Sequence, residues 1–358
     1  MKIFNGKFGA FFAFLITSAA VLTAHSHGDN NFIVTNLVSD LPGVAPKTDP
    51  NLVNSWGLTF DVSGNLIVAD NGTSLSTSYA EDGTILNFVV NVPSDPSGVE
   101  INPSPSSFII PSTAFPAEFL FATENGTILA FNQNVDPNNA IVVIDRSANN
   151  SVYKGLAIAQ QPTGQFFLFA ADFHNGLVDI FDSSFNFVSS FTDPSIPQGF
   201  APFNVSEIYN NLYVTYAKQL APDNHDDQAG PGNGFIDIFN TDGTFMKRLV
   251  SRGALNSPWG LALAPKRFGK FGGFLLVGNF GNGIINAYDP ISGKFRGQLQ
   301  SKDGVIVIPG LWGIRFNPSQ DCNNHAPALF FASGPNCESA GLVGKITSGG
   351  GRCSCSMR

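Results

Sequence analysis

One short pattern recurs six times along this chain: an apolar segment that opens with a glycine and an apolar residue, followed by a second apolar segment that ends in a polar turn. The opening residues are glycines, with one asparagine, at Gly57, Gly98, Gly155, Asn204, Gly260 and Gly313. Successive anchors lie 41, 57, 49, 56 and 53 residues apart. A repeat of about 50 residues built from strands is the signature of a β-propeller. The sequence therefore predicts an all-β fold, a six-bladed β-propeller.

Each repeat contains up to four strand-like segments and no long helical periodicity. In the first repeat these segments are Trp56–Phe60, Asn65–Ala69, Ser74–Tyr79 and Ile85–Val90. The sixth repeat lacks a clear fourth segment, whereas Phe32–Ser39 is strand-like and precedes the first repeat. We expect this N-terminal strand to become the outer strand of the last blade and close the ring, because closure removes exposed sheet edges. Residues 26–348 then form the propeller, and 349–358 form a Gly- and Cys-containing tail that we expect to be disordered.

The N-terminus has the organisation of a secretory signal peptide. Lys2 and Lys7 give it a positive start, and the apolar run Phe8–Leu22 is followed by small residues. We expect residues 1–25 to be removed by cleavage between Ala20 and Ser26. The alternative is an uncleaved membrane anchor, for which a 15-residue run is short. No later segment is long and apolar enough to span a bilayer, so the mature chain is expected to be secreted, or to reside in a periplasm or on the extracellular surface.

All four cysteines lie near the C-terminus, at Cys322, Cys337, Cys353 and Cys355. In an exported protein an even number of cysteines suggests disulfides. Cys322 and Cys337 flank one apolar strand of the sixth repeat, and we expect them to pair. A cysteine metal site is the rival interpretation, but the spacings fit no zinc pattern.

The charge pattern excludes one class of partner. The net charge is −8, and the short cluster at Lys266, Arg267 and Lys270 is not a basic stripe. Nucleic-acid binding requires a basic footprint, so we expect no nucleic-acid partner. An unidentified protein, a glycan or a small molecule remain as candidate ligands.

Parts of the chain resemble known families. The segments Trp-Gly-Leu-Ala-Leu at 259–263, Gly-Phe-Leu-Leu-Val-Gly-Asn at 273–279 and Ile-Ile-Asn-Ala-Tyr-Asp at 284–289 are similar to NHL repeats, which form six-bladed propellers. Tyr-Ala-Lys-Gln at 216–219 and the segment from His225 to Asp237, with the two motifs Asn-Ser-Trp-Gly at 54–57 and Ser-Pro-Trp-Gly at 257–260, resemble a family of secreted, functionally uncharacterised bacterial propeller proteins. This resemblance covers residues 32–347. It implies the fold and an exported protein, but no activity.

Propeller topology predicts where a ligand would bind. Strand direction alternates, so the loop before the first strand of a blade and the loop between its second and third strands lie on one face. The ligand-binding candidates at such places are Trp56, Lys154, Trp259, Trp312, Asp70 and Asp172. An aromatic rim over a polar wall suits a sugar, a peptide or a flat organic molecule. Alternatively the tryptophans only wedge the blades apart, and the aspartates only form turns.

The segment Ala221–Gly234 is long for a blade turn, and long loops in compact domains are often functional. It contains the candidate metal ligands Asp223, His225, Asp226 and Asp227. Clustered carboxylates suit Ca²⁺, which takes six to eight oxygen ligands. A solvated acidic turn and a catalytic histidine are the alternatives.

No catalytic motif such as Gly-x-Ser-x-Gly or His-Glu-x-x-His occurs in the sequence. Calcium-dependent lactonases are also six-bladed propellers, and the matching positions here are Asn54, Glu100, Asn204 and Glu207. Asparagines in sequons that an exporting host can glycosylate are Asn71, Asn125 and Asn149. The sequence favours an exported, non-enzymatic binding or interaction propeller. The alternatives are a Ca²⁺-dependent lactonase- or esterase-like hydrolase acting in the central channel, and a structural surface protein.

Overall fold

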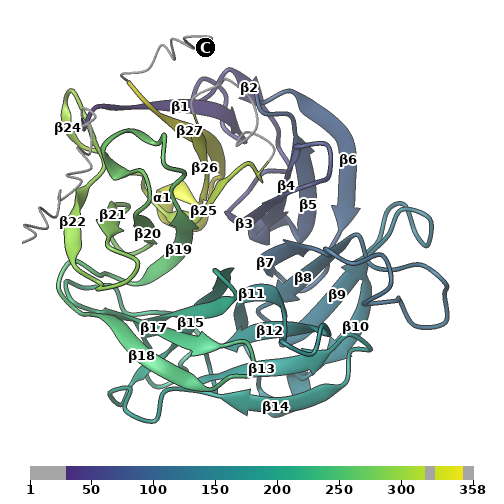
Figure 1. Ribbon diagram of the computed structural model, residues 1–358. Helices are drawn as coiled ribbons and strands as arrows, with labels where there is room; N and C mark the ends of the chain where they lie inside the picture. The colour runs from purple at the N-terminus through teal and green to yellow at the C-terminus, as the bar shows by residue number, and fades with distance from the viewer. Residues whose placement is uncertain (1–29, 319–326, 350–358) are drawn as a thin grey trace, which may run out of the picture.

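The computed structural model describes residues 30–318 and 327–349. Six sheets of mainly antiparallel strands stand around a common centre, with their first strands innermost (Figure 1). The predicted all-β, six-bladed propeller is therefore confirmed. The predicted signal peptide, most of the C-terminal tail and Cys322 lie outside the described residues.

Five blades are four-stranded sheets whose strands follow chain order from the centre outward. The first is β3 (Ser55–Phe60), β4 (Leu66–Asp70), β5 (Leu75–Tyr79) and β6 (Ile85–Asn91). The second is β7 (Pro96–Ile101), β8 (Phe119–Thr123), β9 (Thr127–Phe131) and β10 (Ile141–Asp145). The third is β11 (Tyr153–Gln160), β12 (Phe166–Asp172), β13 (Leu177–Asp182) and β14 (Phe187–Phe191). The fourth is β15 (Phe200–Ile208), β16 (Asn211–Lys218), β17 (Gly234–Asn240) and β18 (Phe245–Ser251). The fifth is β19 (Pro258–Leu263), β20 (Leu275–Asn279), β21 (Ile285–Tyr288) and β22 (Phe295–Gln298).

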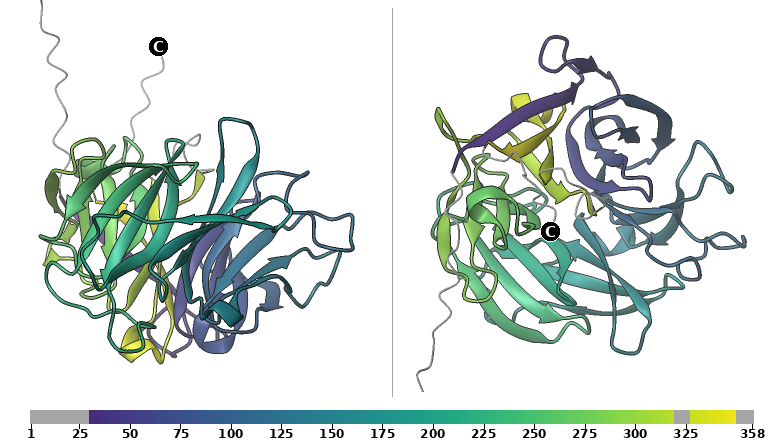
Figure 2. Two further views of the ribbon diagram at one scale, coloured as in Figure 1. Left: turned by 90° about the horizontal axis from the view of Figure 1, so that it is seen from below. Right: turned by 45° about the horizontal axis from the view of Figure 1, so that its top comes forward.

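The sixth blade combines strands from both ends of the chain. It contains β25 (Leu311–Phe316), β26 (Ala328–Ser333), β27 (Leu342–Ser348) and β1 (Phe32–Ser39), with the short β2 (Lys47–Thr48) parallel to β1. Strand β1 pairs antiparallel with β27 from Phe32 opposite Ser348 to Ser39 opposite Leu342, and Figure 2 shows the two strands side by side. The Phe32 ring also packs on Phe268 and Phe271 of the fifth blade, with ring centroids 4.9 and 6.0 Å away.

The remaining elements are short. They are the hairpin β23 (Gln300–Ser301) and β24 (Gly304–Val305), the 3₁₀ turns η1 (Asn71–Thr73), η2 (Ser147–Asn149) and η3 (Gly269–Phe271), and the helix α1 (Pro335–Glu338). No helix of the described residues is long and apolar enough to cross a membrane.

The anchor glycines of the repeat are explained by contacts between neighbouring inner strands. A Cβ atom at Gly57 would lie 2.6 Å from the carbonyl oxygen of Ser97, and one at Gly313 would lie 2.7 Å from that of Trp56. Gly98, Gly155 and Gly260 meet the next inner strand in the same way. At the sixth anchor, Asn204 Nδ2 instead donates a hydrogen bond to the carbonyl of Trp259 at 2.8 Å. The anchors therefore form a closed ring of strand contacts around the axis.

Each inner strand also carries a β-bulge at its anchor. A β-bulge changes the direction of the neighbouring side chains. In each inner strand the affected side chain is that of the residue just before the anchor. Those residues are Trp56, Ser97, Lys154, Phe203, Trp259 and Trp312. The four aromatic ones, from four different blades, pack together with Phe173 and Phe280 across the axis. We call these six aromatic side chains the axial plug.

Candidate functional site

A cluster of charged side chains lies over the axial plug, on the face where loops enter the inner strands. We call this the loop face and the opposite one the turn face. Lys154 is 1% exposed, and its Nζ donates to Glu124 Oε1. The ammonium lies 3.6 Å from Asp226 Oδ1 and 5.0 Å from the centroid of the Trp56 ring. A buried ammonium thus connects the aromatic plug to carboxylates of the second and fourth blades.

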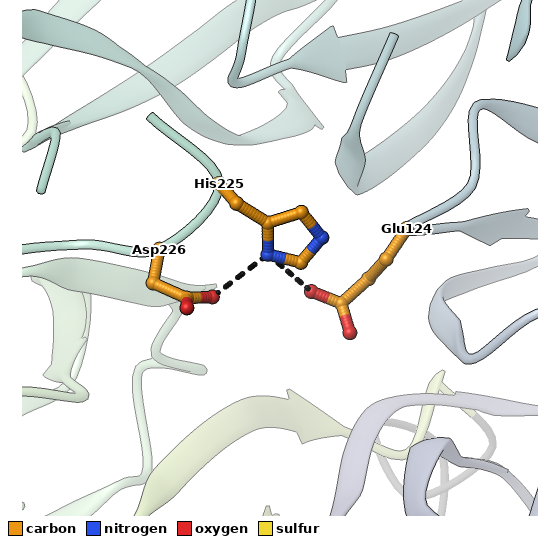
Figure 3. A group of neighbouring side chains, drawn as sticks. All are labelled: Glu124, His225 and Asp226. Carbon is orange, nitrogen blue, oxygen red and sulfur yellow. Dashed lines mark hydrogen bonds and ion pairs between the residues drawn. The ribbon is translucent and has the colours of Figure 1, made fainter. Parts of the chain in front are cut away.

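His225 completes this cluster. Figure 3 shows its ring between Asp226 and Glu124, with Nδ1 3.0 Å from Asp226 Oδ1 and 4.0 Å from Glu124 Oε1. The hydrogen bond to Asp226 raises the pKa of His225, and the same bond lowers the pKa of Asp226. A carboxylate on one ring nitrogen fixes the orientation of the ring and leaves the other nitrogen for a ligand.

Two amides position Glu124 from the other side. Asn71 Nδ2 donates to Glu124 Oε2 at 2.8 Å, and Asn54 Nδ2 donates to Asn71 Oδ1 at 3.1 Å. Because both oxygens of Glu124 are bonded, the carboxylate is held in one orientation.

Two further carboxyl groups lie next to this cluster, and their contacts do not offset the cost of burying their charge. Burial raises the pKa of Asp227, which neighbours Ser257 and Lys154, and burial also raises the pKa of Glu338 on α1. Trp56 Nε1 is buried and forms no hydrogen bond with the described residues. The buried atoms Asp227 Oδ2, Ser257 Oγ, Glu338 Oε1 and Asn54 Oδ1 have only loose contacts, Asp227 with Ser257 and Glu338 with Asn54. The centre of the loop face therefore has unused hydrogen-bonding capacity.

An open pocket of about 430 Å³ borders the cluster, and we call it the loop-face pocket. Its walls come from the second, third and fourth blades and consist almost entirely of hydrogen-bonding residues. They are Glu124, Asn125, Ser147, Asn150, Ser151, Val152, His174, Asp223 and His225. The long loop Ala221–Gly234 thus reaches from the fourth blade to the second, and His174 Nδ1 lies 3.0 Å from the backbone carbonyl oxygen of Asp223.

The predicted metal ligands are only partly brought together. Single ligand atoms of His225, Asp226 and Glu124 lie within 4.8 Å of one another. Asp223 and Asp227 do not belong to this group. The Lys154 ammonium contacts Glu124 and lies near Asp226, so it already supplies the positive charge that a cation would bring.

Glu124 directly follows β8, the second strand of its blade, which places it on the loop face. Its partner Lys154 was predicted on the same face, but no sequence signal pairs the two.

The predicted ligand-binding tryptophans are buried rather than arranged as an open rim. Trp56 and Trp312 stack with ring centroids 3.6 Å apart, and Trp259 meets Trp312 edge-on at 5.8 Å. Their exposed fractions are 3, 2 and 5% for Trp56, Trp312 and Trp259. Trp312 also stacks on Phe280 at 3.9 Å, and Trp259 Nε1 donates to the carbonyl of Lys154 at 3.2 Å, so the three rings contact the rest of the plug and Lys154.

The two predicted aspartates make contacts inside their own blades. Asp70 is fully buried and accepts from Thr77 Oγ1 at 2.7 Å, and burial holds its pKa well above the usual value. Asp172 accepts from the backbone N–H groups of Val152 and Asn175, at 3.1 and 3.2 Å, and burial raises its pKa as well. The Asp172 contacts are those of a turn-forming residue, whereas Asp70 bonds a side chain of the neighbouring strand β5.

The positions matched to the calcium lactonases do not converge. Asn54 lies on the loop face and Asn204 in the ring of anchors. Glu100 is paired with Arg315 through bonds of 2.8 and 3.0 Å, and Glu207 accepts from the backbone of Asn210 at 2.6 Å.

Among the sequons, Asn71 is buried and bonded to Glu124. Its amide is therefore inaccessible in the folded chain, whereas Asn125 and Asn149 are exposed. Cys337 is exposed and has no disulfide partner among the described residues, but its expected partner Cys322 lies outside them, so their pairing stays a prediction.

The comparisons with known proteins agree with the fold. No family model matches the chain. Streptogramin B lyase has a TM-score of 0.51 at 13% identity and covers 88% of this chain and 98% of its own. The luciferin-regenerating enzyme has a TM-score of 0.52 at 12% identity, and the match covers 84% of this chain and 93% of the enzyme. A protein of unknown function from Bacteroides thetaiotaomicron has a TM-score of 0.55 at 10% identity, and the match covers 88% of this chain and 76% of that protein. At such identities these similarities show the β-propeller fold alone.

Sequence relatives define the family. An uncharacterised protein of Acanthamoeba polyphaga mimivirus is 34% identical over 332 residues, which is 87% of this chain and 79% of the viral protein. A second uncharacterised protein of that virus is 34% identical over 298 residues, 78% of each chain. The chain belongs to the same family as these viral proteins.

Proposed function

We propose that this protein is an exported binding propeller without catalytic activity, and that it holds a small, hydroxyl-rich molecule such as a sugar in the loop-face pocket. The observation that carries the proposal is the lining of this pocket. Eight of its nine residues have side chains that donate or accept hydrogen bonds, Val152 being the exception, and they come from three blades. A few convergent polar groups in a concavity are typical of ligand sites.

The side chains of Glu124 and His225 are held in place by their neighbours, and this supports a role in ligand binding. Both are fixed by neighbours, Glu124 by Lys154 and Asn71, and His225 by Asp226. Side chains held in place before binding lose little conformational freedom when a ligand arrives. Such a wall selects ligands by the geometry of their hydroxyl groups.

The calcium-dependent hydrolase is not favoured, for a specific reason. The three atoms best placed to hold a cation surround a site next to the Lys154 ammonium. A divalent cation there would have to displace that ammonium from its contact with Glu124.

The test is a glycan array followed by calorimetry with the best mono- or disaccharide. We expect Asn125→Ala and His225→Ala each to weaken binding by about tenfold, since each removes a hydrogen bond to the ligand. Asn186→Ala, on the turn face, serves as the matched control and should bind as the wild type does. Absence of sugar binding, or binding that neither pocket variant affects, contradicts the proposal.

A further inference from the structure

The molecule contains a second concavity on its axis, on the other side of the plug. It is a channel of about 590 Å³, lined by the inner strands of all six blades. Its lining includes the anchors Gly98, Asn204 and Gly313 and the residues that follow them toward the turn face. The ring of anchors and the plug separate this channel from the loop-face pocket, so the channel is an independent site.

The residues two positions after the anchors form one layer of this channel. Five of them line it, namely Glu100, Ala157, Ser206, Ala262 and Arg315, whereas Thr59 is buried and does not. Arg315 of the sixth blade reaches past the first blade to Glu100 of the second, in a two-pronged ion pair with N–O distances of 2.8 and 3.0 Å. The three blades opposite contribute only Ala157, Ser206 and Ala262. The free volume at this depth therefore lies on the side of the small residues.

Among the described residues that line the channel, three carry charge: Glu100, Glu207 and Arg315. Arg315 neutralises Glu100, and Glu207, one position beyond Ser206, is exposed. The carboxylate of Glu207 accepts one backbone hydrogen bond, from Asn210. The described lining residues thus carry a net charge of −1. The second carboxylate, Glu207, is on the same strand as the free volume and also interacts electrostatically with Arg315.

Apolar side chains share the outer level of the channel with Glu207. Ile158, Leu263 and Phe316 occupy the equivalent position in three other blades, and all three are half-buried. Apolar surface left half-exposed in a concave site gains free energy when a ligand covers it. A carboxylate beside such surface is complementary to a molecule with one positive charge and a short hydrocarbon body.

We propose that the axial channel binds a small amphipathic cation, whose ammonium group pairs with Glu207 and whose hydrocarbon part covers Ile158, Leu263 and Phe316. The anionic charge of the whole chain, −8, favours the approach of such a ligand over an anionic one.

Calorimetry with n-butyl-, n-pentyl- and n-hexylammonium chloride tests this proposal on the full chain. Affinity should rise about fourfold for each added methylene that is buried. Hexan-1-ol should bind more weakly than hexylammonium, and hexanoate most weakly of the three. Equal or tighter binding of hexanoate, or no binding of hexylammonium, overturns the proposal.

Two variants locate the site. Glu207→Gln should weaken hexylammonium binding by about fivefold, the upper range for a solvent-accessible ion pair, and leave hexan-1-ol unchanged. Ser206→Phe fills the free side of the channel and should abolish binding of both. Asn149→Ala, at an exposed loop-face position outside both concavities, is the control and should bind both ligands as the wild type does. Unchanged hexylammonium binding in Glu207→Gln contradicts the proposal even if Ser206→Phe fails to fold.

Discussion

At the scale of single residues, the anchor glycines leave no space for a methyl group. A Cβ at Gly313 would lie 2.7 Å from the carbonyl oxygen of Trp56, a backbone atom that cannot move alone. We expect Gly313→Ala to lower the free energy of unfolding by about 2 kcal/mol, the usual cost of overpacking. Urea denaturation measures this. The control is Gly278→Ala, where the nearest atom is Leu311 Cδ2, in a movable side chain, at 3.2 Å. Equal effects at the two glycines would refute the close-contact explanation of the repeat.

A buried aspartate in the fourth blade makes the free energy of unfolding depend on pH. Asp237 is fully buried and accepts from Arg248 Nε at 2.9 Å, while Arg248 also bonds Asp193. Burial raises the pKa of Asp237 to about 7. One guanidinium shared by two carboxylates does not offset this burial.

The sign of this pH dependence follows from proton binding. Between the unfolded pKa of about 4 and the folded value, the native state holds more protons than the unfolded state, so stability falls as pH rises. The contribution of Asp237 is fully present below about pH 4 and is lost as pH rises through about 7. We expect Asp237→Asn to flatten the decline of unfolding free energy between pH 4 and 7, as measured by urea denaturation at several pH values. Parallel curves for the two proteins would show that Asp237 does not bind the proton.

At the scale of elements, β1 carries the outer edge of the sixth blade. It pairs with β27 along its whole length, and Phe32 anchors it to the fifth blade. Deleting residues 26–40 exposes the edge of β27 and removes the buried Phe32 ring. Loss of a buried phenylalanine alone costs about 3–5 kcal/mol, and an open edge promotes aggregation.

The measurement for this deletion is thermal unfolding with light scattering, compared with a deletion of residues 350–358. We expect a lower melting temperature and scattering for the first deletion only. A variant lacking residues 26–40 that is as stable as the full chain would show that β1 is dispensable for closure.

The positions of the strands could be predicted from the sequence because each strand is specified locally, by apolar residues between turn residues. The predicted segment Ile85–Val90, for example, falls within β6 (Ile85–Asn91). The site was less readable, since its key contacts join distant blades. Lys154 meets Glu124 and Asp226, and nothing in the sequence specifies that the loop Ala221–Gly234 reaches the second blade. The β-bulges could not be predicted from the sequence either. They direct the tryptophan side chains toward the axis, where they form the axial plug and not an open rim.

At the scale of the whole molecule, the plug divides the axis into two chemically different halves. The loop face has an ammonium, a histidine and several carboxylates over buried aromatic rings, while the channel beyond the anchors has one ion pair, small residues and apolar side chains. Because loops build one half and inner strands build the other, we expect substitutions in the loop Ala221–Gly234 to change the first half without altering the second.

The last prediction concerns the maturation of the whole chain, that is, cleavage of the export signal and formation of a disulfide. If residues 1–25 are an export signal, the protein recovered from the medium or periplasm begins between Ala20 and Ser26, and its cysteines meet an oxidising environment. A Cys322–Cys337 bond closes a loop with 14 intervening residues, which in the chain-entropy model stabilises the fold by roughly 3 kcal/mol. Intact mass and non-reducing peptide mapping of the exported protein check both points, and a reductant should then lower the free energy of unfolding. Alkylation of both thiols without prior reduction would rule out the bond, and a chain that still carries Met1 would rule out cleavage. Replacing both cysteines with serine provides the control, because this variant should be insensitive to reductant.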